Sequence, residues 1–368
     1  MSRMSSEMRA PLKATDLPRP ATPAITPKGS PEAPTAPSNP VLLRRWRGGF
    51  PESAHRGAWA LVDSAGDVLD GAGAFRSPVF ARSSTKAIQA LPLLEAGAAR
   101  AHALTPVDLA LACSSHNAED CHTRPVEALL TRLDLTVADL GCGAAPPGDP
   151  ETRRALFGAG HSPTALHHNC SGKHAGFLAL ARHLGVDPVA YLDPESPGQL
   201  LVRAAMCELC DLEDEGYAIA TDGCSAPTFR LPLDKLATGL ARVANPDDLS
   251  AERRDACRAL THAVATHPVL VAGTHKRICT ALAAVTGGRL FPKLGAEAVY
   301  VVGELGTDRA LALKVDDGSI PAMNHVVVGL LARLGMLKAG ELEALSTWTD
   351  RRLFNDAGRE IGEVEVLA

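Results

Sequence analysis

Residues 298–318 read AVYVVGELGTDRALALKVDDG, two apolar runs on either side of a short LGTD segment. Alternation of apolar with small or polar residues about such a turn predicts a β-hairpin. Residues 58–73, AWALVDSAGDVLDGAG, repeat the pattern around DSAG. The sequence therefore predicts one hairpin near each end of the chain.

Between the two hairpins the apolar residues recur at helical spacing. Helices are predicted over 83–103, 125–135, 172–184, 198–210, 231–243, 249–266 and 276–286, and AMNHVVVGLLARLGML (322–337) predicts a further helix after the second hairpin. Strands at both ends with helices between them favour an α+β fold over an alternating parallel sheet. We expect one antiparallel sheet built jointly by both hairpins, with helices on both faces and a mostly helical middle.

The first 40 residues differ in composition from the rest. They are rich in Pro, Ser, Thr and Ala and nearly empty of large apolar side chains, so they cannot bury enough surface to offset the entropy of ordering. We expect a disordered, Pro-rich tail over 1–40 and a single catalytic domain over 41–368. The tail lacks the apolar segment of a secretory signal.

Composition also limits the partners. The net charge of −5 is spread along the chain, and only 4% of residues are aromatic, which excludes a basic nucleic-acid surface and a base-stacking platform. No apolar run approaches 18 residues, so no membrane span is expected. The nine cysteines, without a secretory signal, indicate free thiols in a reducing cytoplasm. The ligand is expected to be a small molecule.

The segment RSSTKAIQ (82–89) places Ser83 and Lys86 three residues apart at a predicted helix start, where their side chains share one face. A desolvated lysine can take the proton of a serine and make it a nucleophile. The alternative is a helix cap, because hydroxyl side chains commonly satisfy free N–H groups there.

Two further motifs support the enzymatic interpretation. Ser115, His116 and Asn117 follow the apolar LALAC, and Lys293, Leu294 and Gly295 precede the strand AVYVVG. The order S-x-x-K, S-x-N, K-x-G resembles that of penicillin-recognising and glutaminase-like serine hydrolases, in which the K-x-G strand borders the nucleophile.

The middle of the chain carries a second cluster. HNCSGKHAG (168–176) contains Cys170, Lys173 and His174, and TDGCSAPTF (221–229) contains Asp222 and Cys224. Two thiolates with a nitrogen ligand favour a soft metal, zinc above others, and two buried thiols are the alternative. The Cys207-x-x-Cys210 pair lies in an amphipathic helical segment without a second such pair, so we interpret it as packing.

The chain resembles the Rhizobium etli type (thermolabile) L-asparaginases from about Val41 to Gly335. The similar blocks are ARSSTKAIQALPLLEAGAA, ALACSSHNAE, HNCSGKHAGFLALARHLG, DGCSAPTFRLPL and LALKVDDG, in that family's order. The resemblance implies a fold like that of serine β-lactamases and glutaminases, a homodimer, and hydrolysis of L-asparagine to L-aspartate and ammonia.

The resemblance also implies roles for individual residues. The implied catalytic pairs are Ser83 with Lys86 and Ser115 with Lys293; the implied zinc ligands are Cys170, Lys173 and Cys224; and Arg82, Asn117, His174 and Asp222 are the expected substrate-binding or supporting residues. In that family the zinc ion adjusts substrate binding and does not generate hydroxide. NAED follows Ser115-His116 here, where the family prefers Asn-Gly-Glu.

We expect Ser83 to attack the amide carbon while Lys86 accepts its proton, and Ser115 remains an alternative nucleophile. Three other functions stay open: a glutaminase, a β-lactamase-like serine hydrolase, and a non-catalytic zinc or redox-sensing module. A pocket distinguishes asparagine from glutamine by one methylene, worth only about 1–3 kcal/mol.

Overall fold

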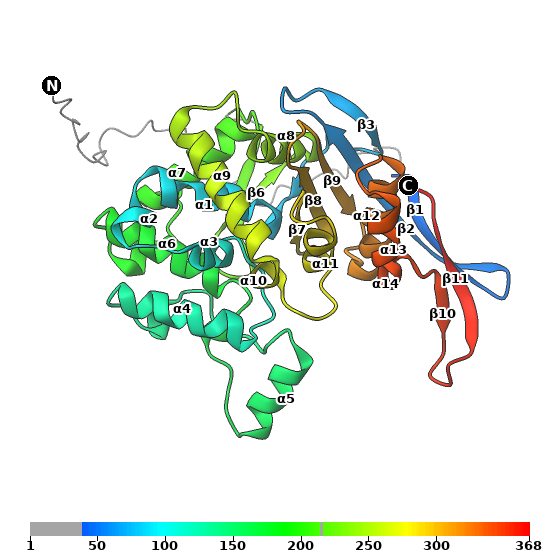
Figure 1. The fold of residues 1–368 in the computed structure, drawn as a ribbon, viewed down its shortest axis with the longest axis horizontal. Coiled ribbons are helices and arrows are strands. Elements are labelled where there is room, and N and C mark those ends of the chain that lie inside the picture. The colour runs from blue at the N-terminus through cyan, green and yellow to red at the C-terminus, as the bar shows by residue number, and fades with distance from the viewer. Residues whose placement is uncertain (1–38, 214–215) are drawn as a thin grey trace, which may run out of the picture.

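The main sheet confirms the predicted α+β architecture. The structure, a computed structural model, describes residues 39–213 and 216–368. In these residues the main sheet has eight strands in the order β10-β11-β1-β2-β9-β8-β7, with β3 paired to β2 (Figure 1). The strands are β1 (Val41–Arg47), β2 (Phe50–Val62), β3 (Val68–Ala72), β7 (Leu290–Gly295), β8 (Val299–Glu304), β9 (Ala310–Val315), β10 (Arg352–Phe354) and β11 (Glu360–Val366).

Both predicted hairpins are present, and they join in one sheet. In the first hairpin Trp59 pairs with Ala72, and in the second Tyr300 pairs with Leu313. The two hairpins meet where β2 runs antiparallel to β9, with Trp59 opposite Leu313. The chain ends therefore build the sheet together, as the sequence predicts.

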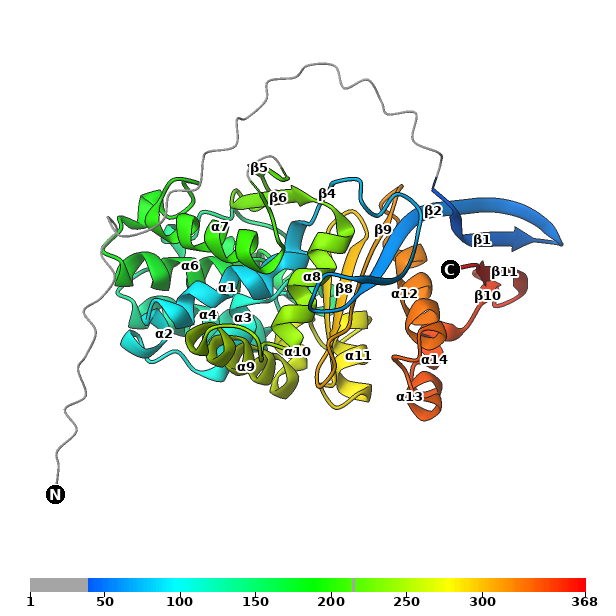
Figure 2. The same ribbon diagram turned by 90° about the horizontal axis from the view of Figure 1, so that it is seen from above.

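Helices cover both faces of this sheet (Figure 2). They are α1 (Lys86–Glu95), α2 (Ala98–Ala101), α3 (Pro106–Ala112), α4 (Asp120–Arg132), α5 (Pro150–Gly158), α6 (Ser171–His183), α7 (Pro197–Leu209), α8 (Leu233–Ala244), α9 (Ala251–Thr266), α10 (Pro268–Ala272), α11 (Ile278–Val285), α12 (Ile320–Arg333), α13 (Ala339–Ala344) and α14 (Ser346–Thr349). The helix α8 packs on β2, β8 and β9 from the helical side, and α12 packs on β1, β9 and β11 from the other.

Strand alternation divides the buried residues into two cores. Along β2, Ala58 and Ala60 face the helical side, whereas Trp59 and Leu61 face α12. Successive side chains of a strand point to opposite faces, so a sheet covered on both sides reads as nearly continuous apolar sequence. The small alanines on the helical side leave room for α8 to lie close to the strands.

Several elements of the structure differ from the sequence predictions or were not predicted. The predicted helix 83–103 is a 3-10 turn over Arg82–Thr85 followed by α1 and α2, which are separated at Gly97 with φ of +84°. A three-stranded sheet of order β4-β6-β5 lies in the middle of the chain. The segment YAIA (217–220) has the composition of a strand and overlaps β5 at Ala218–Thr221, whereas β4 at Val79–Phe80 and β6 at Pro227–Leu231 were not expected. Helices α3, α5, α10, α13 and α14 and strands β1, β7, β10 and β11 are also additional to the expected elements.

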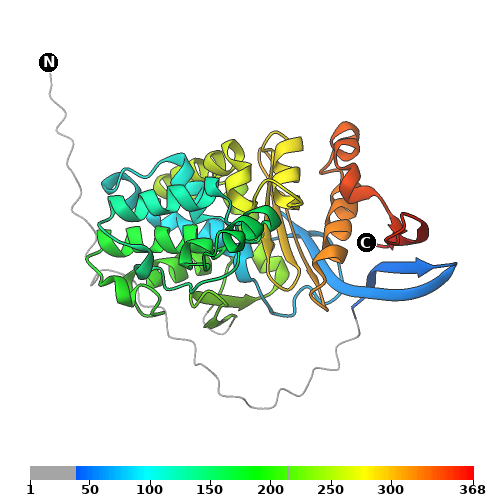
Figure 3. The same cartoon turned by 90° about the horizontal axis from the view of Figure 1, so that it is seen from below.

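The strands from the two termini lie side by side, β1 in blue and β11 in red in Figure 3. Leu43 pairs with Val366 and Arg47 with Gly362. The expected tail over 1–40 lies outside the described residues except for Asn39 and Pro40. Asn39 is attached to the sheet, because its amide donates to Asp316 at 2.9 Å and accepts from Ala74 N at 2.7 Å.

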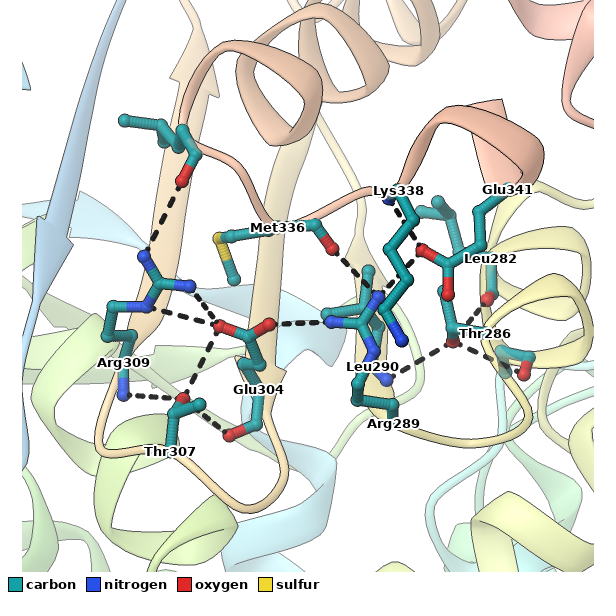
Figure 4. Close-up of polar contacts among 12 residues, drawn as sticks. Leu282, Thr286, Arg289, Leu290, Glu304, Thr307, Arg309, Met336, Lys338 and Glu341 are labelled. Atoms are coloured by element: carbon teal, nitrogen blue, oxygen red, sulfur yellow. Dashed lines mark hydrogen bonds and ion pairs between the residues drawn. The ribbon is translucent and has the colours of Figure 1, made fainter. Parts of the chain in front are cut away.

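A charge network holds the turn end of the β8–β9 hairpin to the C-terminal helices (Figure 4). Glu304 is buried and accepts from Arg289 and Arg309 at 2.6 Å each. Arg289 also donates to Glu341 at 2.7 Å and to the carbonyl of Met336 at 3.1 Å. Arg289 immediately precedes β7, the edge strand of the sheet, so the network anchors the start of that strand.

Candidate functional site

The turn before α1 has a strained residue directly ahead of Ser83. Arg82 has φ of +53°, an unusual conformation for a side chain with a Cβ, and such strain is concentrated at functional positions. Its guanidinium donates to Asp222 at 2.7 Å, so these two predicted substrate-binding residues pair with each other. Ser83 is partly exposed, whereas Ser84, Thr85 and Lys86 are buried.

Lys86 points away from the solvent into the interior of the site. Its Nζ donates to the carbonyl of Ser114, to Ser115 Oγ at 3.0 Å and to Cys170 Sγ at 3.1 Å. An ammonium group has three N–H donors, and these three acceptors use all of them. Among the described residues Lys86 makes no hydrogen bond to Ser83, so it contacts the second predicted serine instead of the first.

Lys293 reaches the same hydroxyl from the opposite side. Its Nζ lies 2.9 Å from Ser115 Oγ and 2.9 Å from the carbonyl of Leu294. Lys293 lies within β7, so the K-x-G motif forms the edge strand itself. Burial and then the charge of Lys86 lower the pKa of Lys293 to about 7. Lys293 is therefore close to half neutral near neutral pH.

Gly295 allows β7 to approach the turn that carries Ser83. A Cβ at this position would lie 2.8 Å from the carbonyl oxygen of Ala81 and 3.3 Å from Ser84 N. Only a residue without a side chain fits so close to the backbone. This contact explains why the third motif ends in glycine and places Lys293 beside the start of α1.

Hydrogen bonds of the main chain hold the Ser115 loop to other segments of the protein. Ser115 N donates to the carbonyl of Val271 at 2.8 Å, and His116 N to that of Asn169 at 3.1 Å. Asn117 is buried, and its Oδ1 accepts from Arg277 at 2.9 Å. The same guanidinium donates to the carbonyl of Ser115 at 2.7 Å. The predicted substrate-binding Asn117 thus has an amide oxygen already engaged within the protein.

The two cysteines and the lysine of the middle cluster converge beside Lys86. Lys173 Nζ donates to Cys224 Sγ at 3.1 Å, and Cys224 Sγ donates to Asp222 Oδ2 at 3.8 Å. The interaction with Cys224, aided by the charge of Lys86, lowers the pKa of Cys170 well below its usual value, whereas the interaction with Cys170 and burial raise the pKa of Cys224. Although burial opposes it, the charge of Cys170 raises the pKa of Lys173. The cluster therefore places a thiol of lowered pKa beside the amines of Lys86 and Lys173.

The donor set fits a soft cation only if the lysine takes part. Within residues 39–213 and 216–368 no group of three or more His, Cys, Asp or Glu side chains converges on a common point. Two sulfurs and the Lys173 amine do converge, and sulfur and nitrogen donors suit zinc. Lys173 would have to release its proton to bind.

His174 lies behind this cluster on α6. Gly141 N donates to the hydroxyl of Tyr191 at 2.7 Å, and that hydroxyl lies 2.6 Å from His174 Nδ1. Tyr191 therefore donates its proton to Nδ1, and the ring carries its own proton on Nε2. Burial lowers the pKa of His174 well below its usual value, so the ring is neutral. Its Nε2 has no partner among the described residues.

Arg277 and Tyr191 hold predicted site residues but were not themselves predicted from the sequence. Neither belongs to a short motif: Arg277 lies sixteen positions before Lys293, and Tyr191 follows a Pro-containing turn. Their contacts arise where loops meet, and the periodicity of apolar residues in the sequence does not predict contacts between loops.

Residues 43–366 match the family model described as L-asparaginase II. The chain belongs to the L-asparaginase II family. Membership makes it a hydrolase acting on an amide of a small molecule. A comparison with curated proteins found no match.

In the described part of the chain, each helix is too short or too polar to cross a bilayer. All nine cysteines are free thiols, as expected from their sequence context.

Proposed function

We propose that this protein hydrolyses L-asparagine to L-aspartate and ammonia through a serine nucleophile and a covalent aspartyl-enzyme. The observation that carries the proposal is the hydroxyl of Ser115 between Lys86 and Lys293, at 3.0 Å and 2.9 Å. Two buried lysines on one serine are unfavourable for folding, because burial disfavours the charged amine. Such groups are concentrated at catalytic sites.

The hydroxyl of Ser115 relays a proton between Lys86 and Lys293. Ser115 accepts a hydrogen bond from the Lys86 ammonium and donates its own proton to neutral Lys293. Transfer along this chain leaves Lys86 neutral and Lys293 protonated, with no change in total charge. Lys86 is then a base for the proton of Ser83, one helical turn away.

Ser83 is the proposed nucleophile because it is partly exposed at the start of a helix, whereas Ser115 is 6% exposed and already bonded to both lysines. Main-chain N–H groups at a helix start have no partner within the helix and favour negative charge. They would stabilise the oxyanion of the tetrahedral intermediate, a contribution of about 3 kcal/mol per donor elsewhere. The protonated Lys293 then supplies, through Ser115, the proton that departing ammonia requires.

Cys170, Lys173 and Cys224 are the residues that would hold zinc, which would adjust substrate binding and would not generate hydroxide. The neutral ring of His174, with a buried and unpartnered Nε2, is a donor suited to a substrate oxygen. Asp222 and Arg82 carry the charges expected to recognise the α-ammonium and α-carboxylate. The assembly proposed from the resemblance is a homodimer, which sedimentation equilibrium tests.

The test is ammonia release from L-asparagine and L-glutamine, with a chromogenic β-lactam as the third substrate. We expect turnover of asparagine above glutamine and none of the β-lactam. A faster glutamine reaction would make the protein a glutaminase, and β-lactam hydrolysis alone would overturn the proposal.

A second measurement identifies the nucleophile. Rapid quenching with asparagine followed by peptide mass spectrometry should find the aspartyl group on the peptide containing Ser83. Ser83→Ala should abolish both the adduct and ammonia release, whereas Ser115→Ala should slow formation of an adduct that is still on Ser83. An adduct on Ser115 would exchange the roles of the two serines.

The metal is tested on the purified protein without substrate. We expect about one zinc ion per chain, lost in Cys170→Ser and in Cys224→Ser but retained in Cys257→Ser, a buried cysteine of α9. Binding should strengthen as the pH rises, because the thiols and Lys173 must lose protons. Metal-free protein with a Cys170–Cys224 disulfide would favour a redox role.

A further inference from the structure

The loop between α10 and α11 packs directly on the Ser115 loop. Gly273 has φ of +132°, and a Cβ there would lie 2.5 Å from Asn117 Nδ2. Thr274 donates from N and Oγ1 to the carboxylate of Glu119 at 3.0 Å and 2.6 Å. Arg277 closes the loop with its two hydrogen bonds, to Asn117 Oδ1 at 2.9 Å and to the carbonyl of Ser115 at 2.7 Å.

We propose that Arg277 is a positioning residue for the reaction: its guanidinium fixes the Ser115 carbonyl relative to the side-chain amide of Asn117, and keeps a positive charge beside Lys293. The kinetic consequence rests on the proposed function. No sequence motif contains this residue, and its role follows from contacts between loops.

Arg277 suits this role because its donors form a rigid fork. Two N–H groups of one guanidinium reach two acceptors in adjacent parts of the same loop, which defines the orientation of Ser115 relative to Lys293. A lysine offers one flexible ammonium and cannot reproduce the planar arrangement. Since Ser115 Oγ lies between two lysines at hydrogen-bond distance, a small rotation of its main chain would lengthen one of those bonds.

The charge of Arg277 acts on the same lysine. The titratable or charged groups that interact electrostatically with Lys293 are Lys86 from α1, Cys113 after α3, Cys170 before α6, and Arg277 and Cys279 at the start of α11. Arg277 and Lys86 are the cations of this set, and both lower the pKa of Lys293, whereas Cys279 and Cys170 raise it. Removing the guanidinium should therefore make Lys293 hold its proton more strongly.

Two substitutions separate geometry from charge. Arg277→Met removes both, and Arg277→Lys keeps the charge but loses the fork. Lys276→Gln is the matched control, because it removes a cation from the exposed part of the same loop. Each variant is checked for folding by circular dichroism, and kcat and KM are measured with asparagine from pH 5.5 to 9.

Arg277→Met should lower kcat about tenfold to a hundredfold, with a smaller change in KM, as expected for a misplaced reacting group. The acidic limb of the pH profile of kcat for this variant should move to higher pH by about half a unit to one unit, because loss of a nearby cation raises the pKa of Lys293. Arg277→Lys should lower kcat but leave the limb in place, and Lys276→Gln should change neither. A limb unmoved in Arg277→Met would overturn the proposal, leaving Arg277 a structural residue.

A second readout needs no substrate. In protein labelled with ¹³C at lysine Cε, the Lys293 signal is the one missing from Lys293→Met. Its titration midpoint should rise in Arg277→Met and stay in Arg277→Lys and Lys276→Gln. If wild-type protein releases no ammonia from any amide, the proposed function fails while this titration still decides the role of Arg277. An unchanged midpoint in a folded Arg277→Met variant would contradict the inference directly.

Discussion

Strands β7 and β8 carry two charged clusters with opposite character, one near each end of the pair. Around Glu304, two acidic and two basic side chains alternate, and each contact joins opposite charges (Figure 4). Around Lys293, three lysines are almost fully buried, and within the described residues none donates to a carboxylate.

The difference separates a stabilising cluster from a reactive one. Opposite charges in contact favour the charged state of every member, so the residues of the Glu304 network are poor acids and bases. Buried cations that share a serine and two thiols compete for protons, and one of them titrates near pH 7. Substitutions in the first cluster should cost stability, and those in the second should cost activity.

The largest effect is expected for Lys86→Met and Lys293→Met. Each should lower kcat/KM for asparagine by about 10³-fold or more, since each breaks the proton path through Ser115. The double variant should lose scarcely more than either single one, because the two lysines act as one unit. Lys314→Met, a lysine on β9 bonded to main-chain carbonyls, is the control and should retain activity. Additive losses in the double variant would mean that the lysines act separately.

Glu304→Gln should produce the largest loss of stability. It leaves Arg289 and Arg309 without their buried carboxylate, at a cost of about 3 kcal/mol in the free energy of unfolding. Urea unfolding measures it, and kcat below the melting transition should stay near the wild-type value. Glu365→Gln, which breaks the half-exposed pair with Arg44, should cost less than about 1 kcal/mol. Equal losses in both variants would show that burial does not distinguish the clusters.

Lys293→Met should stabilise the fold while it removes activity. Burial penalises the charged amine of Lys293, and an apolar side chain of similar size does not carry that penalty. The pKa of Lys293 is about 7 in the folded protein against 10.5 normally. Below pH 7 both folded and unfolded chains hold the proton, so the burial penalty is complete. From pH 7 to 10.5 only the unfolded chain holds it, so the wild type gains stability as the pH rises.

The advantage of the Met variant in urea unfolding should therefore be greatest below pH 7 and shrink above it. An advantage independent of pH would mean that Lys293 keeps an ordinary pKa, and the proton relay would lose its neutral lysine.

The smallest effect is expected for deletion of residues 1–38. Their composition predicts no packed core, so the melting temperature and specific activity should stay within experimental error. The deletion stops before Asn39, whose contacts with Asp316 and Ala74 belong to the fold. A melting temperature several degrees lower would show that the tail contacts the domain.

Local sequence patterns predicted much of the fold. Alternation at 58–73 and 298–318 gave both hairpins, and helical periodicity gave α4, α6, α7, α8, α9, α11 and α12 within a few residues. The strand β1 was missed because VLLRRWR carries arginines at positions that alternation expects to be apolar on one face. The short β10 and the Gly- and Glu-rich β11 have equally weak patterns, and they become strands by pairing with each other and with β1.

For the site, the sequence by itself determined which reactive side chains exist and the order of their motifs. It placed Ser83, Lys86, Ser115, Lys293, Cys170 and Cys224 in segments of recognisable chemistry. Only the tertiary structure decided the partners: Lys86 contacts Ser115 and Cys170 and makes no described hydrogen bond to Ser83, and Arg277 holds the loop between them. Helical spacing reports which side chains share a face of one element, but proton affinities depend on burial and on charges from distant segments, which exist only once the chain has folded.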